Sequence, residues 1–187
     1  QDLVNEIKKK EWWNNKEKRD DIELWTTDIY PEYLSRIELL RDRIETLNFR
    51  CDLLSSALLQ KVSDSTKYIL NSFGESFCQL IQKHYPLWAM GIEKPRPLLT
   101  VDFIPKIFKP FFDKYIKSRD QSAYIIVFDG MRWDEWEILK PKIMNIFHGK
   151  MAMEDVIPLI SILPSTTEWA RRALFAGNFP RNFSSDT

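Results

Sequence analysis

Two stretches of this chain combine reactive side chains with apolar runs that can position them. The apolar run at residues 124–128 ends in the carboxylate of Asp129, and the run at residues 156–163 is followed by a hydroxyl cluster at residues 165–167. A carboxylate is a hard anionic metal ligand, and a hydroxyl bound to a metal ion loses its proton more easily and becomes a nucleophile. These residue types therefore suggest metal-assisted attack by a hydroxyl.

Each apolar run has the composition of a β-strand, and a helix is predicted between them. Residues 124–128 lack polar alternation and are β-branched at their centre, as in a strand buried on both faces. Residues 133–147 carry apolar side chains at helical spacing. A strand, a helix and a strand in this order predict a βαβ unit with parallel strands, so we expect an α/β fold in the C-terminal half. Asp129 and the hydroxyl cluster then lie at the same edge of the sheet, where sites form.

Structural explanations exist for the same residues. Ser165 and Glu168 have the spacing of a capping box, with Ser165 as the N-cap of a helix. Asp129 and Gly130 are typical of a turn, and Asp129 can also cap the helix that follows. The structural and chemical interpretations are compatible, because Ser165 can cap a helix while Thr167 reacts.

The two stretches resemble the motifs of PglZ domains, which belong to the alkaline phosphatase superfamily. In the first motif an apolar strand ends in Asp, followed by Leu/Met-Arg-aromatic-Asp-x-Trp, as in residues 125–136. The second motif is Pro-Thr/Ser-x-Thr and then Ala-Arg-Asn/Arg-Ala-Leu/Ile-Phe-Ser/Ala-Gly, as in residues 164–177. The resemblance covers about residues 120–183 and is to the N-terminal part of the domain, as found in PglZ-type bacterial response regulators. It implies the start of an alkaline-phosphatase-like parallel sheet with flanking helices.

The resemblance also implies an activity and the residues that carry it. It implies a hydrolase of phosphate or sulfate esters with two divalent metal ions, usually zinc, and phosphodiesters including cyclic oligonucleotides are substrates of the response-regulator branch. By position, Asp129 is expected to be a metal ligand, and Thr167 is expected to be both the nucleophile and a metal ligand. Arg132 and Arg171 are weaker candidates for contacts with an anionic substrate, since either can instead pair with a neighbouring acidic residue.

Two departures from the family pattern limit these expectations. Ala170 stands where phosphodiesterases of the superfamily have an Asn that helps to hold the phosphate. The family's other metal ligands are Asp and His residues far downstream, whereas this sequence stops at Thr187 and contains only His84 and His148, outside any matching motif. We therefore expect half of a site, inactive alone, in a piece of a longer cytoplasmic protein.

The residues before these motifs predict an all-α helical bundle. The proline-rich segment at residues 93–97 separates a bundle and linker domain at residues 1–92 from the PglZ-like domain at residues 93–187. A long helix is expected after Pro31, with a new helix capped near residues 63–65 and ended by Pro86. The long helix carries apolar residues at the a and d spacing of a heptad repeat, namely Tyr33, Ile37, Leu40, Ile44, Leu47, Cys51, Leu54 and Leu58. This seam, from Ile37 to Leu58, fits either a bundle or a homodimer.

Composition narrows the function classes further. Lys plus Arg and Asp plus Glu balance at 27 each, so no overall field favours duplex nucleic acid or an anionic membrane. The apolar runs are shorter than the roughly 20 residues of a membrane helix, and Cys51 and Cys78 are expected to be reduced, buried thiols. Two functions remain: a metal-dependent phosphoester hydrolase in a bacterial signalling or defence protein, or a regulatory and dimerisation module that couples an input, as in two-component systems, to an effector.

Overall fold

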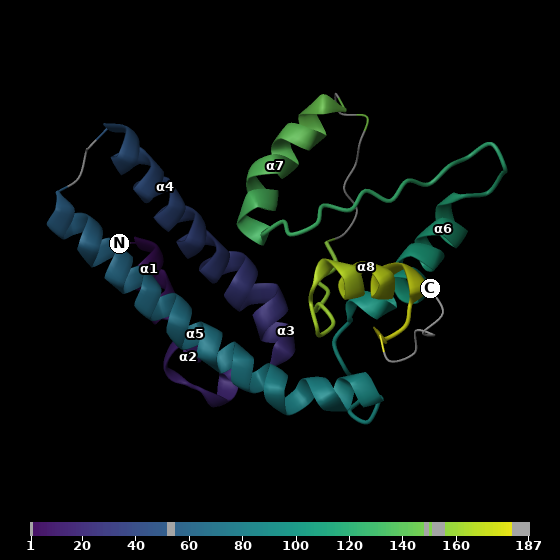
Figure 1. Cartoon of the computed structure of the whole chain (residues 1–187), viewed down its shortest axis with the longest axis horizontal. Helices are drawn as coiled ribbons and strands as arrows, with labels where there is room; N and C mark the ends of the chain where they lie inside the picture. Colours follow the sequence, from purple (N-terminus) through teal and green to yellow (C-terminus); the bar gives the residue numbers. More distant parts are fainter. Residues whose placement is uncertain (1, 52–54, 148–149, 151–155, 181–187) are drawn as a thin grey trace. The chain divides into compact units, whose positions relative to one another are not determined.

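The computed structural model describes residues 2–51, 55–147, 150 and 156–180, which form two compact units (Figure 1). The first unit comprises Gln1–Glu93 and Arg132–Asp155, and the second comprises Lys94–Met131 and Val156–Thr187. Residues 132–155 thus group with the N-terminal residues, although they lie after the predicted domain boundary between residues 92 and 93. That boundary stays a prediction. Among the described helices, none is long and apolar enough to cross a membrane.

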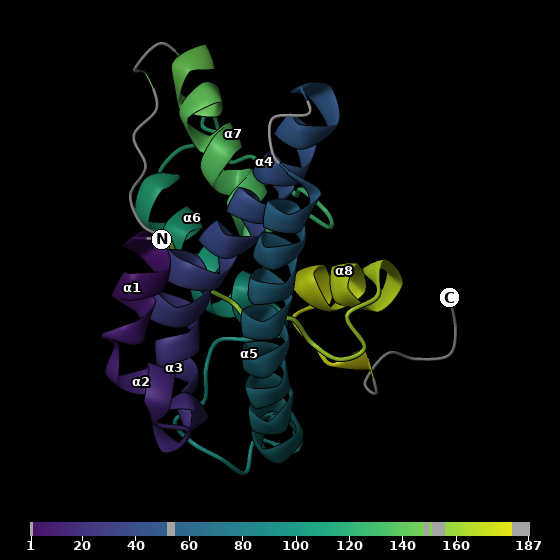
Figure 2. The same cartoon turned by 90° about the vertical axis from the view of Figure 1, so that its left-hand side faces the viewer.

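The first unit is built on a helical hairpin. Its elements are α1 (Asp2–Lys8), α2 (Glu11–Asn14), the 3-10 helix η1 (Glu17–Asp20), α3 (Ile22–Leu24), the π-helix η2 (Trp25–Leu34), α4 (Ser35–Cys51), α5 (Ser56–Met90) and α7 (Trp133–Ile146). α4 and α5 run antiparallel and lie side by side (Figures 1 and 2). η1 packs on α5, and η2 and α7 pack on α4.

Arg19 is the buried centre of this unit. Its Nε donates to the carbonyl oxygen of Trp12 (2.9 Å), and its guanidinium also donates to the carbonyl oxygen of Trp13 (2.6 Å). The guanidinium lies 4.4 Å from the ring centroid of Phe73 on α5, and the indole N–H of Trp25 donates to the carbonyl oxygen of Arg19 (2.7 Å). Burial lowers the pKa of Arg19. One cation therefore ties the N-terminal segment to α5.

The helix boundaries in this unit differ from those predicted. α4 ends at Cys51 and α5 starts at Ser56, where the hydroxyl of Ser55 accepts from the backbone N–H of Leu58 (3.4 Å), so the predicted single helix through Leu58 was wrong. Residues 63–65 lie inside α5 rather than at a helix start. Pro86 does not end the helix either, since α5 continues to Met90 and is capped by Gly91 in the left-handed region (φ 71°).

The second unit is a compact group of short helices. Its elements are the 3-10 helix η3 (Thr100–Asp102), the π-helix η4 (Phe103–Phe108), α6 (Lys109–Tyr115) and α8 (Thr167–Ala176). α8 packs on η3 and η4, and Leu99, Val101, Ile162 and Ala173 are buried. Gly177 caps α8 with φ 64°, a left-handed conformation that favours glycine, whereas a Cβ there would meet the ring of Pro105 only at an ordinary contact distance of 3.5 Å.

The expected parallel sheet is not formed by the described residues, and the α/β prediction was wrong. Residues 124–128 are extended but belong to no strand, and the run at residues 156–163 contributes one parallel bridge, between Leu99 and Ile160. An apolar β-branched run favours an extended backbone, but a strand also needs a hydrogen-bonded neighbour. The helix predicted at residues 133–147 is confirmed as α7, which packs on α4 instead of crossing over a sheet. Its predicted stop, Gly149, lies outside the described residues.

Asp102 is the polar anchor of the second unit. Its buried carboxylate accepts hydrogen bonds from the backbone N–H of Leu99 (2.9 Å) and from the guanidinium of Arg96 (2.9 Å), and it pairs with the ammonium of Lys106 (2.9 Å). Burial by itself disfavours the charged form, but these donors outweigh it and lower the pKa of Asp102 to about 2. Asp102 therefore joins the residues before η3 to η4.

This pKa predicts a pH dependence of stability. Because the folded-state pKa lies below the ordinary value of 3.8, the ionised carboxylate stabilises the fold above that value, and the stabilisation is lost as the pH falls towards 2. The difference corresponds to about 2 kcal/mol in the free energy of unfolding. Urea unfolding between pH 2 and 6 should show a rise in the wild type, and the rise in Asp102→Asn should be smaller by about this amount, because other carboxylates with lowered pKa values contribute to both proteins. Parallel pH profiles for the two proteins would contradict it.

Candidate functional site

Asp129 lies in a turn between the extended run and α7. Residues 129 and 130 form the turn, and Gly130 has φ 69°, which a glycine adopts without strain. The predicted turn is therefore confirmed. The alternative that Asp129 caps the next helix was wrong, because the backbone N–H of Arg132 at the start of α7 donates instead to the side chain of Glu135 (3.0 Å).

An ion pair connects this turn to α8. The guanidinium of Arg171 donates to Oδ2 of Asp129 (2.9 Å), and the two side chains are 57% and 47% exposed. Arg171 follows Thr167 by four residues on α8, so the two side chains share a helix face. The pair therefore brings the predicted metal ligand to the face of α8 whose first turn carries the predicted nucleophile.

Thr167 is the first residue of α8, and the residue at the N-cap is not the predicted one. The N-cap residue is Thr166, whose side chain makes no capping hydrogen bond, so the predicted capping box of Ser165 and Glu168 was wrong. The helix starts one residue later than that box requires. Thr166 and Thr167 are both exposed. Thr167 thus lies in the first turn of a helix, where the free backbone N–H groups favour negative charge.

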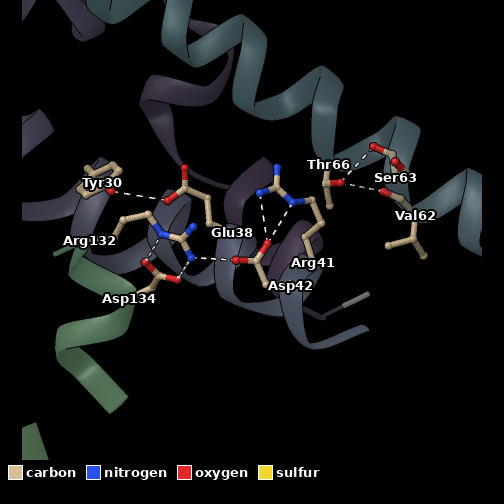
Figure 3. A network of polar contacts seen from close by, with 9 residues as sticks. All are labelled: Tyr30, Glu38, Arg41, Asp42, Val62, Ser63, Thr66, Arg132 and Asp134. Atoms are coloured by element: carbon tan, nitrogen blue, oxygen red, sulfur yellow. Dashed lines mark hydrogen bonds and ion pairs between the residues drawn. The ribbon is translucent and has the colours of Figure 1, made fainter. Parts of the chain in front are cut away.

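Arg132 lies in the first unit and is held by two carboxylates (Figure 3). Its Nε donates to Oδ1 of Asp134 (2.9 Å), and another of its nitrogens donates both to Oδ2 of Asp134 and to Oδ2 of Asp42 (each 2.7 Å). Asp134 is only 2% exposed, and hydrogen bonds from Arg132 lower its pKa despite burial. Arg132 therefore makes the ion pair with a neighbouring acid that was the alternative to a substrate contact.

Residues of η2 and α4 complete this network, and sequence reasoning missed them. The other oxygen of Asp42 accepts from Arg41 (3.2 Å), and the hydroxyl of Tyr30 donates to Glu38 (3.4 Å), as Figure 3 shows. Burial, helped by the nearby charge of Asp134, raises the pKa of Glu38, and burial raises that of Tyr30 to about 12. The available signal was the four-residue spacing of Glu38 and Asp42, which places two acids on one helix face.

The described residues alone do not complete a metal centre. Asp129 and Thr167 supply a carboxylate and a hydroxyl, which are suitable metal ligands, but one oxygen of Asp129 is paired with Arg171. Within the residues that the structure describes, no group of three or more His, Cys, Asp or Glu side chains is arranged to hold a metal ion. The described part of the chain brings together Asp129, Arg171 and the helix of Thr167, while Arg132 belongs to a separate network.

One comparison with known proteins finds a match, and it covers the C-terminal part of the chain. Residues 107–187 match the family model described as the BREX system PglZ alkaline phosphatase-like domain. The search of curated proteins and the search of solved structures each returned no significant match. The family match contains Asp129, Thr167 and Arg171, as well as Arg132.

The network around Arg132 makes a stability prediction. Asp134→Asn should lower the free energy of unfolding by about 2 kcal/mol, because it removes a buried charge from a two-point pair with Arg132. Asp113→Asn is the matched control, since Asp113 pairs with Lys109 on the surface of α6 and should contribute less than about 1 kcal/mol. Denaturant unfolding of both variants measures this. Equal losses of unfolding free energy in the two variants would show that the burial of Asp134 does not strengthen its ion pair with Arg132.

Proposed function

We propose that residues 107–187, which match the model of the PglZ alkaline phosphatase-like domain, contribute to a metal-dependent phosphoester hydrolase in a bacterial signalling or defence protein. The observation that carries the proposal is the Asp129–Arg171 ion pair, since it places a carboxylate beside the helix that begins with Thr167. The reaction class is proposed from the family match, and the roles of Asp129, Thr167 and Arg171 are proposed from their positions. A cytoplasmic location is part of the proposal.

In this proposal Thr167 is the nucleophile and Asp129 a metal ligand. Zinc is the metal we propose, with Asp129 and Thr167 as two of its ligands and residues other than those described as the remainder. The N-terminal turn of α8 favours a phosphoryl group that is attached to, or approaches, Thr167.

The two arginines receive different roles. Arg171 is exposed on the face of α8 that carries Thr167, so it is the better candidate for an anionic substrate contact. Arg132 makes three hydrogen bonds to Asp42 and Asp134, which leaves it less suited to a substrate. We propose a phosphodiester, including cyclic oligonucleotides, as the substrate class. Ala170, in place of the Asn of other phosphodiesterases, predicts that the phosphate is held in a different way.

Substitution of Thr167 tests the hydrolase proposal. In the full-length protein with added zinc, Thr167→Ala should lower the hydrolysis of a generic aryl phosphodiester by on the order of 1000-fold or more, because the nucleophile is lost. Thr166→Ala is the matched control: it removes the adjacent exposed hydroxyl, which makes no capping bond, and should retain most of the activity. Equal rates for wild type and Thr167→Ala would remove Thr167 from the mechanism.

The second candidate function is a regulatory and dimerisation module, and the exposure of α4 favours it. Ile37, the first residue of the predicted seam from Ile37 to Leu58, is already buried inside the first unit, as is Tyr33 before it. Further along α4, Leu40 and Leu47 are 45% and 53% exposed. An apolar stripe of this kind is a surface on which a second copy can pack.

Light scattering tests this dimer. Leu47→Asp should convert a dimer into a monomer, because it places a charge in the apolar stripe. Thr46→Asp is the matched control, with the same added charge on an exposed neighbouring position outside the stripe, and it should remain dimeric. Arg36 and Arg43 lie on the same side of α4 as Leu40 and Leu47, so added salt should strengthen the dimer by screening their repulsion. A monomeric wild type at every salt concentration would exclude the seam dimer.

A further inference from the structure

The ion pair between Asp129 and Arg171 joins two groups to which the proposed function gives separate roles. Both residues belong to the second unit, so their contact does not depend on how the two units are placed. The guanidinium of Arg171 donates to Oδ2 of Asp129 (2.9 Å). Within the described part of the chain, neither side chain makes another ion pair. Each of the two charges is therefore balanced by the other.

A divalent cation on Asp129 cannot leave this pair unchanged. The two oxygens of a carboxylate belong to one small group, so a cation bound to either of them lies within about 5 Å of a guanidinium bound to the other. Two positive charges at this separation repel each other and compete for the same negative charge. The pair itself is weak, because the side chains of Arg171 and Asp129 are 57% and 47% exposed and water screens their attraction. Arg171 is therefore the partner that gives way.

A second anion-binding position lies on the helix that carries Arg171. Arg171 follows Thr167 by four residues on α8, which is one helical turn along the same face. The free backbone N–H groups in the first turn of α8 favour a phosphoryl group at Thr167. A guanidinium adds charge-assisted hydrogen bonds to phosphate oxygens, and its planar set of donors suits that group. An Arg171 side chain released from Asp129 can therefore pair with a phosphoryl group on its own helix face.

We propose that Arg171 exchanges partners: it holds Asp129 while that carboxylate carries no metal ion, and it turns to the phosphoryl group at Thr167 once a divalent cation has taken Asp129. This inference rests on the proposed function, from which it takes the roles of Asp129 and Thr167, and it adds an order of binding. Before metal binding, Arg171 is occupied by Asp129 and contributes little to holding an anion. After metal binding, the same arginine strengthens anion binding, so the metal ion binds before the phosphoester.

Zinc affinity is the first measurement, made on the full-length protein without phosphate by competition with a chromophoric chelator. Arg171→Gln should bind zinc about three- to fivefold more tightly than the wild type, because Asp129 no longer has to give up a guanidinium. Arg172→Gln is the matched control, since it removes the same charge from the next residue of α8. The guanidinium of Arg172 lies over the ring of Trp169 (5.7 Å from its centroid), so this variant should change zinc affinity by less than about 1.5-fold.

Binding of inorganic phosphate to the zinc-loaded protein is the second measurement, read by isothermal titration calorimetry. Arg171→Gln should bind phosphate on the order of tenfold more weakly, because a charge-assisted contact is lost. Arg171→Lys keeps the positive charge and should stay within about threefold of the wild type in both measurements. Opposite changes in the two affinities distinguish an exchange of partners from general damage to the site, which would weaken both.

Two outcomes would overturn the exchange. One is a zinc affinity of Arg171→Gln that is no higher than that of Arg172→Gln, which would mean that Arg171 does not compete for Asp129. The other is an unchanged phosphate affinity of Arg171→Gln, which would mean that the released side chain does not hold the anion.

Asp129→Asn separates these failures from a failure of the proposed function. A loss of zinc affinity of about tenfold or more in this variant keeps Asp129 as a metal ligand, even if the exchange of partners fails. An unchanged zinc affinity, or no zinc binding by the wild type, removes the metal role of Asp129 and overturns both proposals.

Discussion

The burial of one cation, Arg19, is the constraint on which the first unit depends. The helices before α3 are too short to be stable alone, so their position has to come from tertiary contacts. Arg19 supplies these contacts by donating to two carbonyl oxygens of the N-terminal segment, and also to the hydroxyl of Ser76 on α5 (3.1 Å). The ring of Phe73 covers its guanidinium. The α4–α5 hairpin therefore has a fixed N-terminal partner that packs on α5.

Sequence patterns predicted helical segments better than their ends or partners. The spacing of Trp133, Trp136 and Leu139 indicated α7 correctly, because an amphipathic stripe is a local property. The strand at residues 124–128 was predicted wrongly, because apolar β-branched composition says that a segment favours extension and burial but not which neighbour it pairs with. The start of α5 was also missed, since the serines near residue 55 and near residue 64 are equally good caps until packing selects one.

In the candidate site, too, local features were predicted from the sequence and long-range partners were not. The Asp129 turn was predictable because Asp-Gly at the end of an apolar run has few other conformations, and the start of α8 near Thr167 was predictable within one residue. The partners of these residues were not. Arg171 pairs with Asp129, 42 residues earlier in the chain, while Arg132 adds Asp42 from a distant helix to its neighbour Asp134. Ion pairs between distant residues depend on helix packing, which charge spacing along the chain does not encode.

The extended run before Asp129 also affects how the chain behaves in solution. Tyr124 and Ile126 are 86% and 72% exposed, and Val127 and Phe128 are about half exposed. Among the described residues, none is joined to residues 124–128 in a ladder. An exposed extended segment of this composition is a template for pairing between molecules. Preparations of this chain should therefore bind apolar dyes and lose material to aggregation as concentration rises, and a single lysine at position 126 should improve recovery.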